Sequence, residues 1–364
     1  MKSAVLNNVG GPFIIQDVEL LPPQKNEVRV KLKAAGLCHS DWHFVEGKVH
    51  RPFPCILGHE GAGIVEELGE GVTSLRKGQH VVLNWAPSCH KCYYCQHGDT
   101  GLCETWQDWR KGTMMDGSTR FRIDGQPAHQ FTVFSTFTEQ TIVPVEGCVP
   151  IEDDIPFEIA ALVGCAVTTG VGATLNTVDV RPGDSVAVYG CGGVGLSILQ
   201  GARLSNAQPI IGVDNDPDKE AIAKQFGATH FVLAGDDAHT KVKELTEDRG
   251  VDWAFEAVGP PAVQEAAYQA IRSGGALVVV GLAPVGSTTS FSGIDMHRGQ
   301  KRILGSFFGS CDPSREFPRL LGFYRSGQLQ IEEMISKRYS LDQINEGYAD
   351  LLKGGHKRGV LIFD

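Results

Sequence analysis

The spacing of apolar and polar residues divides the chain into a strand-rich first part and a later part in which strands and helices alternate. In the first part, short alternating or β-branched runs bounded by glycine predict strands over 27–33, 63–67 and 79–83. From about residue 184, the pattern predicts strands at 185–189, 209–214, 252–256 and 276–280, with helices that include 216–226 and 261–272. Because parallel strands need crossover connections of about a dozen residues or more, this alternation predicts a doubly wound parallel sheet.

Chain length and local helix signals fit a two-domain α/β protein. The 364 residues exceed the roughly 100–200 residues of an ordinary single domain, so we expect two domains. Asp216 followed by Pro217 has the form of an N-cap and a first helical residue, which predicts a helix directly after the strand that ends at Asp214.

Composition and charge narrow the class of function. The 33 Lys and Arg residues stand against 43 Asp and Glu residues, a net charge of −10, which argues against a nucleic-acid or anionic-membrane surface. The first ten residues lack a basic segment followed by an apolar one, and no run of about 18 apolar residues occurs. We therefore expect a cytoplasmic protein with a small-molecule substrate, in which the ten cysteines serve thiolate chemistry or metal binding.

Four cysteines in one short segment form the strongest local motif. Cys89, Cys92 and Cys95 are followed after seven residues by Cys103. Four thiolates can close a tetrahedral shell around zinc, and a closed shell leaves no position for chemistry. The spacing predicts a structural zinc site; the alternative, free or disulfide-bonded cysteines, fits a reducing compartment poorly.

A glycine-rich turn marks a nucleotide site. Gly190, Gly192, Gly193 and Gly195, with Val194 between the last two, follow the strand predicted at 185–189 and precede a helix. A G-x-G-x-x-G run is weak evidence alone, but here glycine lets the backbone approach a pyrophosphate at a helix N-terminus. Asp214 ends the next strand, where a carboxylate hydrogen-bonds a ribose 2′-hydroxyl and repels a 2′-phosphate. The turn therefore favours NAD over NADP.

A third set of candidate residues is scattered through the first half of the chain. Cys38, His59 and Cys165 contain the parts of a zinc site with two thiolates, one imidazole and an open fourth position. A lone cysteine or histidine is more often an ordinary core residue. Periodicity does not show that these three residues meet in space.

Taken together, the ordered motifs resemble the medium-chain zinc alcohol dehydrogenases, in particular their vertebrate-like and bacterial aryl-alcohol members. The resemblance runs from the Cys38 segment through residues 58–63, the four-cysteine loop, residues 112–121 and the glycine turn to residues 344–348. It implies a β-rich GroES-like catalytic domain at 1–167, completed by 308–364, and a Rossmann NAD-binding domain at 168–307. It also implies a homodimer or homotetramer with two zinc ions per subunit.

The resemblance also implies a role for each site residue. Cys38, His59 and Cys165 would hold the catalytic zinc, Asp41 would orient His59, and Glu60 would lie behind the metal. Ser40 would accept the alcohol proton and His43 would pass it on. The remaining residues would contact NAD: Lys219 beside Asp214 at the ribose, Thr169, Val194, Val280, Gly281 and Leu282 at the nicotinamide, and His39 and Arg358 at the pyrophosphate.

Position 39 departs from the family pattern, since many members place arginine there. A histidine is only partly charged near neutral pH, which predicts weaker cofactor holding; a solvated loop histidine is the alternative. Cys55, Cys148, Cys191 and Cys311 have no ligand role in this pattern, and we expect buried thiols at these positions.

The substrate-pocket assignment predicts a primary alcohol with an apolar or aromatic group, oxidised reversibly to the aldehyde with NAD. The residues at the family's pocket positions are Val49, Trp85, Trp109, Phe131 and Leu282. Ordinary core packing is the alternative for such aromatics. A formaldehyde dehydrogenase acting on a glutathione adduct is a second possible enzyme. The acidic residue that it needs soon after Ser40 and Asp41 is not evident, because the only acid there, Glu46, stands at a different spacing. A catalytically silent NAD-binding protein is a third reading, which the retained zinc ligands disfavour.

Overall fold

The computed structural model describes residues 1–105, 111–354 and 358–364, which form two compact units. The first unit contains Met1–Cys165, Asp312–Gly327 and Ile331–Asp364, and the second contains Ala166–Cys311 with Gln328–Gln330. The bounds expected from the sequence, 167/168 and 307/308, lie a few residues from these divisions. Their assignment to a catalytic and a coenzyme domain stays a prediction.

The first unit is built on a mixed sheet with the order β11-β7-β6-β4-β19-β18, in which β10 also pairs with β4. Inward side chains of β4 such as Val28, Val30 and Leu32 are fully buried and alternate with half-buried polar ones, as a sheet with one face on the core requires. The strands of this unit are β1 (Lys2–Leu6), β2 (Ile14–Asp17), β3 (Glu19–Leu20), β4 (Glu27–Gly36), β5 (Cys55–Ile56), β6 (Glu60–Leu68), β7 (His80–Leu83), β8 (Phe121–Ile123), β9 (Gln126–Ala128), β10 (Gln140–Pro144), β11 (Cys148–Pro150), β18 (Ile335–Tyr339) and β19 (Arg358–Ile362).

The first unit also contains helices. They are α1 (His39–Val45), α2 (Tyr93–Gln96), α4 (Phe157–Leu162), α11 (Pro313–Arg325) and α12 (Ile344–Leu352), with 3₁₀ turns η1 (Thr100–Leu102), η2 (Val145–Gly147), η6 (Glu332–Met334) and η7 (Leu341–Gln343). Since β19 pairs with β4, the last strand of the chain completes the sheet of the first unit.

One long helical segment, Phe157–Thr177, is apolar and long enough to cross a membrane by length and composition, but 83% of its most apolar window is buried in the protein. It passes from α4 through a π-helical turn η3 (Val163–Val167) into α5 (Thr168–Gly172) and a second π-helical turn η4 (Ala173–Thr177). Such π-helical turns occur often at functional sites.

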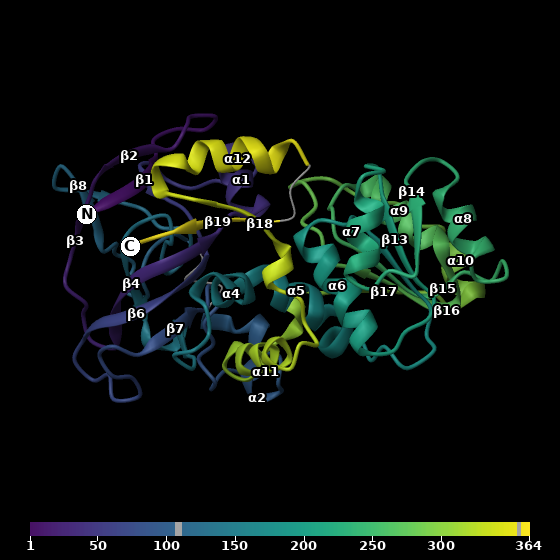
Figure 1. Cartoon of the computed structure of the whole chain (residues 1–364), viewed down its shortest axis with the longest axis horizontal. Helices are drawn as coiled ribbons and strands as arrows, with labels where there is room; N and C mark the ends of the chain where they lie inside the picture. The colour runs from purple at the N-terminus through teal and green to yellow at the C-terminus, as the bar shows by residue number, and fades with distance from the viewer. Residues whose placement is uncertain (106–110, 355–357) are drawn as a thin grey trace. The chain divides into compact units, whose positions relative to one another are not determined.

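The second unit is a six-stranded parallel sheet with the order β14-β13-β12-β15-β16-β17, which confirms the predicted doubly wound fold. Helices α6 and α7 cover one face and α8, α9 and α10 the other (Figure 1). The strand order reverses between β12 and β15, and ligands of such sheets bind outside the carboxyl ends of the strands at that point. The elements are β12 (Val186–Tyr189), α6 (Gly193–Leu204), β13 (Ile210–Asp214), α7 (Lys219–Gln225), β14 (His230–Leu233), α8 (Ala238–Glu244), β15 (Val251–Glu256), α9 (Pro261–Ala270), β16 (Ile271–Val279), α10 (Gly293–Gly299), β17 (Arg302–Gly305) and the turn η5 (Phe308–Ser310).

The main errors in the predicted elements lie at their ends. The helix predicted from Asp216 begins at Lys219, because the Asp216 carboxylate accepts the N–H of Asp218 at 3.0 Å and holds a turn there. The helix predicted to Arg272 ends at Ala270, where β16 already begins. Strands β4 and β6 extend to Gly36 and Glu60, whose backbones pair across the sheet although small residues at these ends gave no strand pattern.

Candidate active site

Four side chains from three separate segments form a buried cluster in the first unit. Cys38 directly precedes α1, His59 directly precedes β6, whose first residue is Glu60, and Cys165 lies in the π-helical turn η3. Their potential ligand atoms all lie within 4.8 Å of one another. The structure therefore brings together the three scattered residues that spacing could not connect, and adds Glu60 beside them.

Asp41 fixes the orientation of the histidine in this cluster. Its fully buried carboxylate accepts the backbone N–H of Gly58 at 2.8 Å and lies 3.2 Å from His59 Nδ1. Gly58 has φ +92°, and a Cβ there would come within 2.4 Å of Thr136 Oγ1, so only glycine fits. With Nδ1 held by Asp41, the Nε2 atom of His59 is left to act as a ligand.

The surroundings of Cys38 lower the pKa of its thiol. A hydrogen bond with the Cys165 thiol is the largest influence that lowers the pKa of Cys38, and His59 and Arg358 add to it against the effect of burial. Because zinc binds the thiolate form of cysteine, this environment fits a metal ligand.

Glu60 and Arg358 form a buried ion pair behind the cluster. Arg358 Nη2 donates to Glu60 Oε2 and, at 3.0 Å, to the carbonyl of Leu37. Burial raises the pKa of Glu60 to about 7, although Arg358 opposes this shift. A Cβ at Gly36 would lie 2.0 Å from Glu60 Oε2, so glycine is required where the carboxylate enters the core. Arg358 thus contacts Glu60, and its expected contact with the pyrophosphate stays a prediction.

The donor set fits a zinc ion. Among the described residues of the cluster, Glu60 Oε1 is a buried oxygen without a hydrogen-bond partner. Two thiols, one imidazole and one carboxylate with a free oxygen supply the N, S and O ligands that zinc accepts. Buried groups of this kind are costly unless a partner such as a metal satisfies them.

The residues expected to relay the proton lie on α1. The Cys38 thiol lies 3.6 Å from Ser40 Oγ, which places the Ser40 hydroxyl at the edge of the cluster. His43 lies one turn further, with Nδ1 3.7 Å from Glu46 Oε2. Within the described residues no hydrogen bond joins Ser40 to His43. His39 is exposed at the start of this helix.

Two of the predicted pocket aromatics flank His59. The Phe131 ring stacks on the His59 ring at 4.4 Å, and the Trp85 ring meets it edge-on at 6.0 Å. Val49 packs against the hydrophobic core that contains Phe131. Leu282 belongs to the second unit, where 56% of it is exposed, and Trp109 lies outside the described residues.

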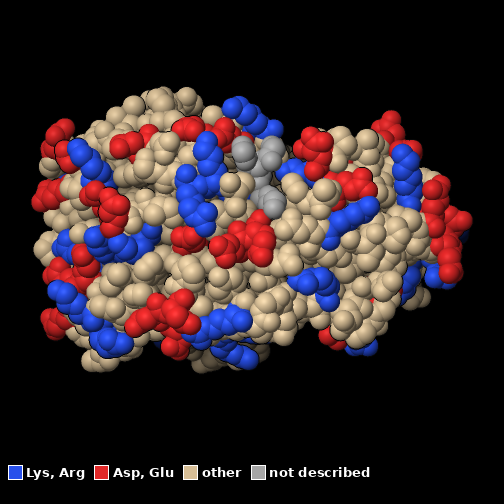
Figure 2. Space-filling view, in the orientation of Figure 1, with Lys and Arg blue, Asp and Glu red and all other residues tan. Residues whose placement is uncertain are grey.

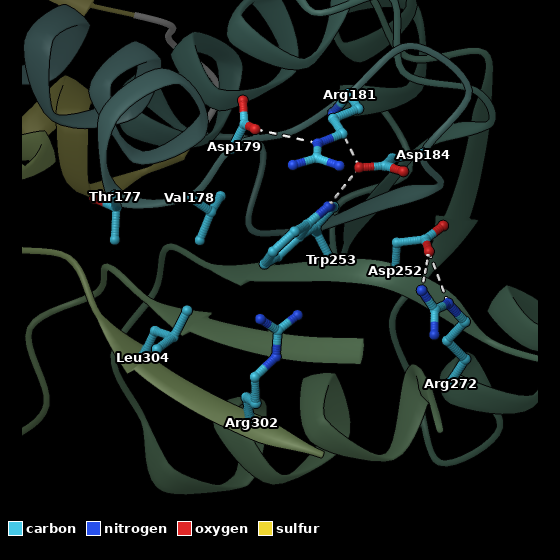
Figure 3. Close-up of a pocket in the computed structure, with 10 residues that line it drawn as sticks. All are labelled: Thr177, Val178, Asp179, Arg181, Asp184, Asp252, Trp253, Arg272, Arg302 and Leu304. Carbon is cyan, nitrogen blue, oxygen red and sulfur yellow. Dashed lines mark hydrogen bonds and ion pairs between the residues drawn. The ribbon is translucent and has the colours of Figure 1, made fainter. Parts of the chain in front are cut away.

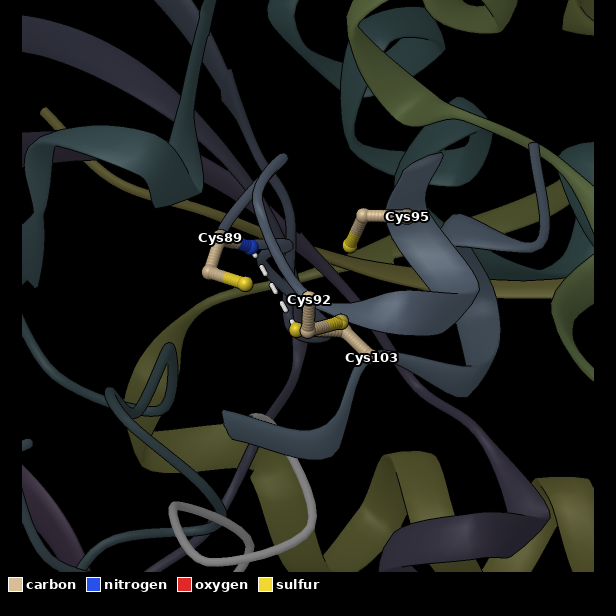
Figure 4. Close-up of side chains that lie close together, drawn as sticks. All are labelled: Cys89, Cys92, Cys95 and Cys103. Carbon is tan, nitrogen blue, oxygen red and sulfur yellow. Dashed lines mark hydrogen bonds between the residues drawn. The ribbon is translucent and has the colours of Figure 1, made fainter. Parts of the chain in front are cut away.

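The four-cysteine loop forms the second cluster of possible metal ligands, with all four sulfur atoms within 4.8 Å of one another (Figure 4). The backbone N–H of Cys89 donates to Cys103 Sγ at 3.3 Å. Burial raises the pKa of Cys89, but hydrogen bonds from Thr105 and from backbone N–H groups outweigh it and lower the pKa to about 6. Helix α2, which carries Cys95, has no buried residue, so a metal held by the four cysteines would supply the order that a core does not.

The glycine turn of the second unit has the form of a dinucleotide site. Gly190 has φ +96°, and a Cβ at Gly195 would lie 1.7 Å from the Gly190 carbonyl oxygen, so both positions require glycine. A Cβ at Gly192 would meet nothing within 4 Å, which leaves room for a ligand to approach the backbone. Asp214 Oδ2 accepts the Cys191 N–H at 2.7 Å, which ties the strand end to the turn. The backbone therefore presents the N-terminus of α6, as a bound pyrophosphate needs.

The other predicted cofactor residues of the second unit lie around this sheet. Lys219 is buried at the start of α7, and Thr169 lies on α5. Val280, Gly281 and Leu282 follow the carboxyl end of β16. One buried acid beside them, Glu256, was not predicted to contribute. Its only sequence signal is its place at the end of a predicted strand, directly before Ala257-Val-Gly259.

The cofactor turn is distinct from a cavity of ≈430 Å³ at the amino ends of β15 and β17 (Figure 3). Its charged groups are largely paired: Arg181 with Asp179 at 3.1 Å and Arg272 with Asp252 at 2.6 Å. Because cofactors of such sheets bind at the carboxyl ends, this cavity is at the wrong edge for NAD.

On the face drawn in Figure 2, acidic and basic side chains are interspersed.

Cysteines without a predicted ligand role are buried, as expected: Cys55, Cys148, Cys191 and Cys311. Burial raises the pKa of Cys55 and Cys191 to about 12, so these thiols stay protonated and inert.

Comparison with known proteins identifies the family. The profile of the alcohol dehydrogenase GroES-like domain matches residues 24–153, and that of the zinc-binding dehydrogenases matches residues 193–326. The NDMA-dependent alcohol dehydrogenase of Amycolatopsis methanolica is 40% identical over 364 residues, which cover 99% of this chain and 98% of that protein. The S-(hydroxymethyl)glutathione dehydrogenase of Paracoccus denitrificans is 36% identical over 100% of this chain and 99% of its own. The crystal structure of benzyl alcohol dehydrogenase from Acinetobacter calcoaceticus superposes with a TM-score of 0.94 at 33% identity, covering 100% of this chain and 99% of that one. The chain therefore belongs to the zinc-dependent medium-chain alcohol dehydrogenases, oxidoreductases that act on alcohols with zinc and NAD as cofactors.

Proposed function

We propose that this enzyme transfers a hydride reversibly between a primary alcohol with an apolar or aromatic group and NAD, giving the aldehyde. The observation that carries the proposal is the buried cluster of Cys38, His59 and Cys165 with Phe131 and Trp85 beside the histidine. Aromatic walls next to a metal position favour apolar substrates. The benzyl alcohol dehydrogenase relative supports the same substrate class.

Cys38, His59 and Cys165 would hold the catalytic zinc, which supplies a Lewis acid for the alcohol oxygen. Asp41 holds the imidazole in place through His59 Nδ1. Ser40, 3.6 Å from the Cys38 sulfur, is placed to accept the alcohol proton at Oγ, and His43 carries it onward. Glu60, whose Oε1 has no hydrogen-bond partner among the described residues, is the candidate to approach the metal during ligand exchange.

The four cysteines Cys89, Cys92, Cys95 and Cys103 would hold the structural zinc, with no part in turnover. This second site makes two zinc ions per subunit. The structure contains no disulfide among the described residues, which fits thiolate ligands and a cytoplasmic location. We also propose a homodimer or homotetramer, in which the edge strand β17 could continue the sheet into a second copy.

NAD would bind at the turn Gly190–Gly195, with Asp214 on the ribose and Lys219 beside it. The nicotinamide would lie near Thr169, Val194 and the turn of Val280, Gly281 and Leu282, and His39 and Arg358 would contact the pyrophosphate. Since the Asp214 carboxylate repels a 2′-phosphate, NAD is the preferred cofactor. Equal use of NADP by the unmodified enzyme would contradict this placement.

Initial rates of NADH formation test the substrate proposal. We expect the zinc-replete enzyme to have a higher kcat/KM for benzyl alcohol than for ethanol, because the larger ring buries more apolar area. Phe131→Ala should reduce this preference, whereas Phe226→Ala, a buried phenylalanine of the second unit, serves as a control for lost core packing. No preference for benzyl alcohol would overturn the assignment of an apolar pocket.

The Paracoccus relative supports a second candidate function, oxidation of the glutathione adduct of formaldehyde. An assay with formaldehyde and glutathione separates the two functions. Turnover of the adduct well above that of benzyl alcohol would favour this second function.

A further inference from the structure

A buried carboxylate lies at the carboxyl end of β15, next to the point where the strand order of the parallel sheet reverses. Glu256 is the last residue of β15 and is fully buried. Its Oε1 accepts the backbone N–H groups of Val258 and Gly259, each at 2.6 Å. Two hydrogen bonds to one oxygen fix the shape of the turn that follows β15, because both N–H groups would lose their partner if the turn moved.

The turn held by Glu256 packs against two segments to which NAD binding is assigned. A Cβ at Gly190 would lie 2.5 Å from Val258 Cγ2, so the Val258 side chain closes one side of the glycine turn. A Cβ at Gly281 would lie 2.4 Å from the Gly259 backbone nitrogen. The turns after β12, β15 and β16 are therefore closely packed against one another.

Backbone hydrogen bonds join the same three turns. Ala257 donates to the carbonyl of Tyr189 at 2.9 Å, and Val280 and Gly281 both donate to the carbonyl of Glu256 at 2.9 Å. The backbone carbonyl of Glu256 thus accepts both N–H groups of the turn after β16, while the Glu256 side chain holds the turn after β15.

We propose that Glu256 is a positioning residue for NAD, which sets the backbone of all three turns at the carboxyl edge of the sheet without touching the cofactor itself. This inference rests on the proposed placement of NAD at Gly190–Gly195. An alanine at 256 would leave two buried N–H groups without a partner, so the turn would shift to recover them. A glutamine keeps one oxygen at the same reach and can accept both N–H groups.

The same strand offers a matched control at its other end. Asp252 Oδ2 also accepts two hydrogen bonds, from the Ser185 N–H at 2.8 Å and the Ser185 hydroxyl at 2.6 Å, and its Oδ1 pairs with Arg272. It lines the cavity at the amino ends of the strands (Figure 3). Both acids stabilise a turn of the same sheet, but only Glu256 stands at the edge where cofactors bind.

The test is the NADH dissociation constant of the zinc-replete enzyme, measured by fluorescence titration alongside the unfolding temperature without NADH. We expect Glu256→Ala to raise Kd about tenfold or more, and Glu256→Gln to restore it to within about threefold of the unmodified enzyme. Glu256→Asp keeps the charge but withdraws the oxygen, and should raise Kd several-fold even if the alanine variant fails to fold. Asp252→Ala should lower the unfolding temperature and leave Kd within about twofold.

Two results would overturn the inference and can be told apart from failure of the proposed function. Tight NADH binding that Glu256→Ala and Glu256→Asp leave unchanged would show that Glu256 does not position the cofactor. Equal increases in Kd for Asp252→Ala and Glu256→Ala would show a general loss of stability instead. Failure of the unmodified enzyme to bind NADH would overturn the placement of NAD itself.

Discussion

The two cysteine clusters of the first unit differ in how the fold assembles them. Cys89, Cys92, Cys95 and Cys103 lie within one loop, where three of the four are only partly buried. Cys38, His59 and Cys165 come from three distant segments and meet in the protein interior. A loop without a hydrophobic core of its own depends on a bound metal for its order. A cluster inside the core instead depends on the fold to bring its residues together, so a metal there serves catalysis more than stability. Substitutions in the two clusters should therefore have different effects on stability and on turnover.

The largest effect is expected from Cys165→Ser. Loss of one thiolate ligand removes the Lewis acid, which supplies several kcal/mol of transition-state stabilisation, so kcat should fall about a thousandfold or more. The neighbouring Val163, Ala166 and Val167 are buried in the core and serine is similar to cysteine in size, so the unfolding temperature should change little. Rates of benzyl alcohol oxidation and a thermal unfolding curve measure both quantities; substantial remaining turnover would show that Cys165 is no ligand.

Cys92→Ser is expected to have the opposite profile. The variant should lose the zinc of the loop and about 5–10 °C of apparent unfolding temperature, because a structural metal contributes directly to folding free energy. At temperatures where it stays folded, kcat should remain within about twofold. Cys55→Ser, which also places a hydroxyl at a cysteine position of this unit, is the control that should keep its full zinc content.

Asp41→Asn tests how the buried cluster is oriented, because it leaves every proposed zinc ligand of that cluster in place. Without the carboxylate beside His59 Nδ1, the ring loses its fixed orientation, and kcat/KM or zinc affinity should fall about 10- to 100-fold. Asp17→Asn, which removes only the partner of Lys2 on the surface, should have no effect. An Asp41→Asn variant with normal zinc retention and kcat/KM would mean that Asp41 only stabilises the fold around Gly58.

The smallest effect is expected from His43→Gln, at the outer end of the proposed relay. Alcohol oxidation should slow about tenfold, most strongly below neutral pH where solvent hydroxide is scarce, and imidazole should partly restore it. Ser40→Ala should be more damaging and resist rescue, since it interrupts the relay at its inner end. An unchanged pH profile for the His43 variant would show that the proton leaves by another route.

Sequence patterns predicted most accurately the elements and motifs that are set by residues close together along the chain. The parallel sheet follows from alternation, and the glycine turn and the four-cysteine loop can each be recognised within one short segment of the chain. The strand ends at Gly36 and Glu60 were missed because small or charged residues there are set by pairing across the sheet. The helix predicted from Asp216 started too early because its carboxylate stabilises a turn equally well.

Contacts between distant segments were beyond sequence patterns. The meeting of Cys38 with Cys165 required the family resemblance, since no spacing connects them. The Glu60–Arg358 pair and the two N–H groups held by Glu256 depend on which side chains the core encloses. A buried acid looks like any other acid in a sequence; only burial shows that it must have a partner.

The zinc content per chain, measured by mass spectrometry after metal-replete preparation, tests most directly the claim of two metal sites with unequal roles. We expect two zinc ions in the unmodified enzyme and one in each of Cys165→Ser and Cys92→Ser, with turnover lost only in the first variant. A single zinc in the unmodified enzyme, or equal loss of turnover in both folded variants, would contradict it.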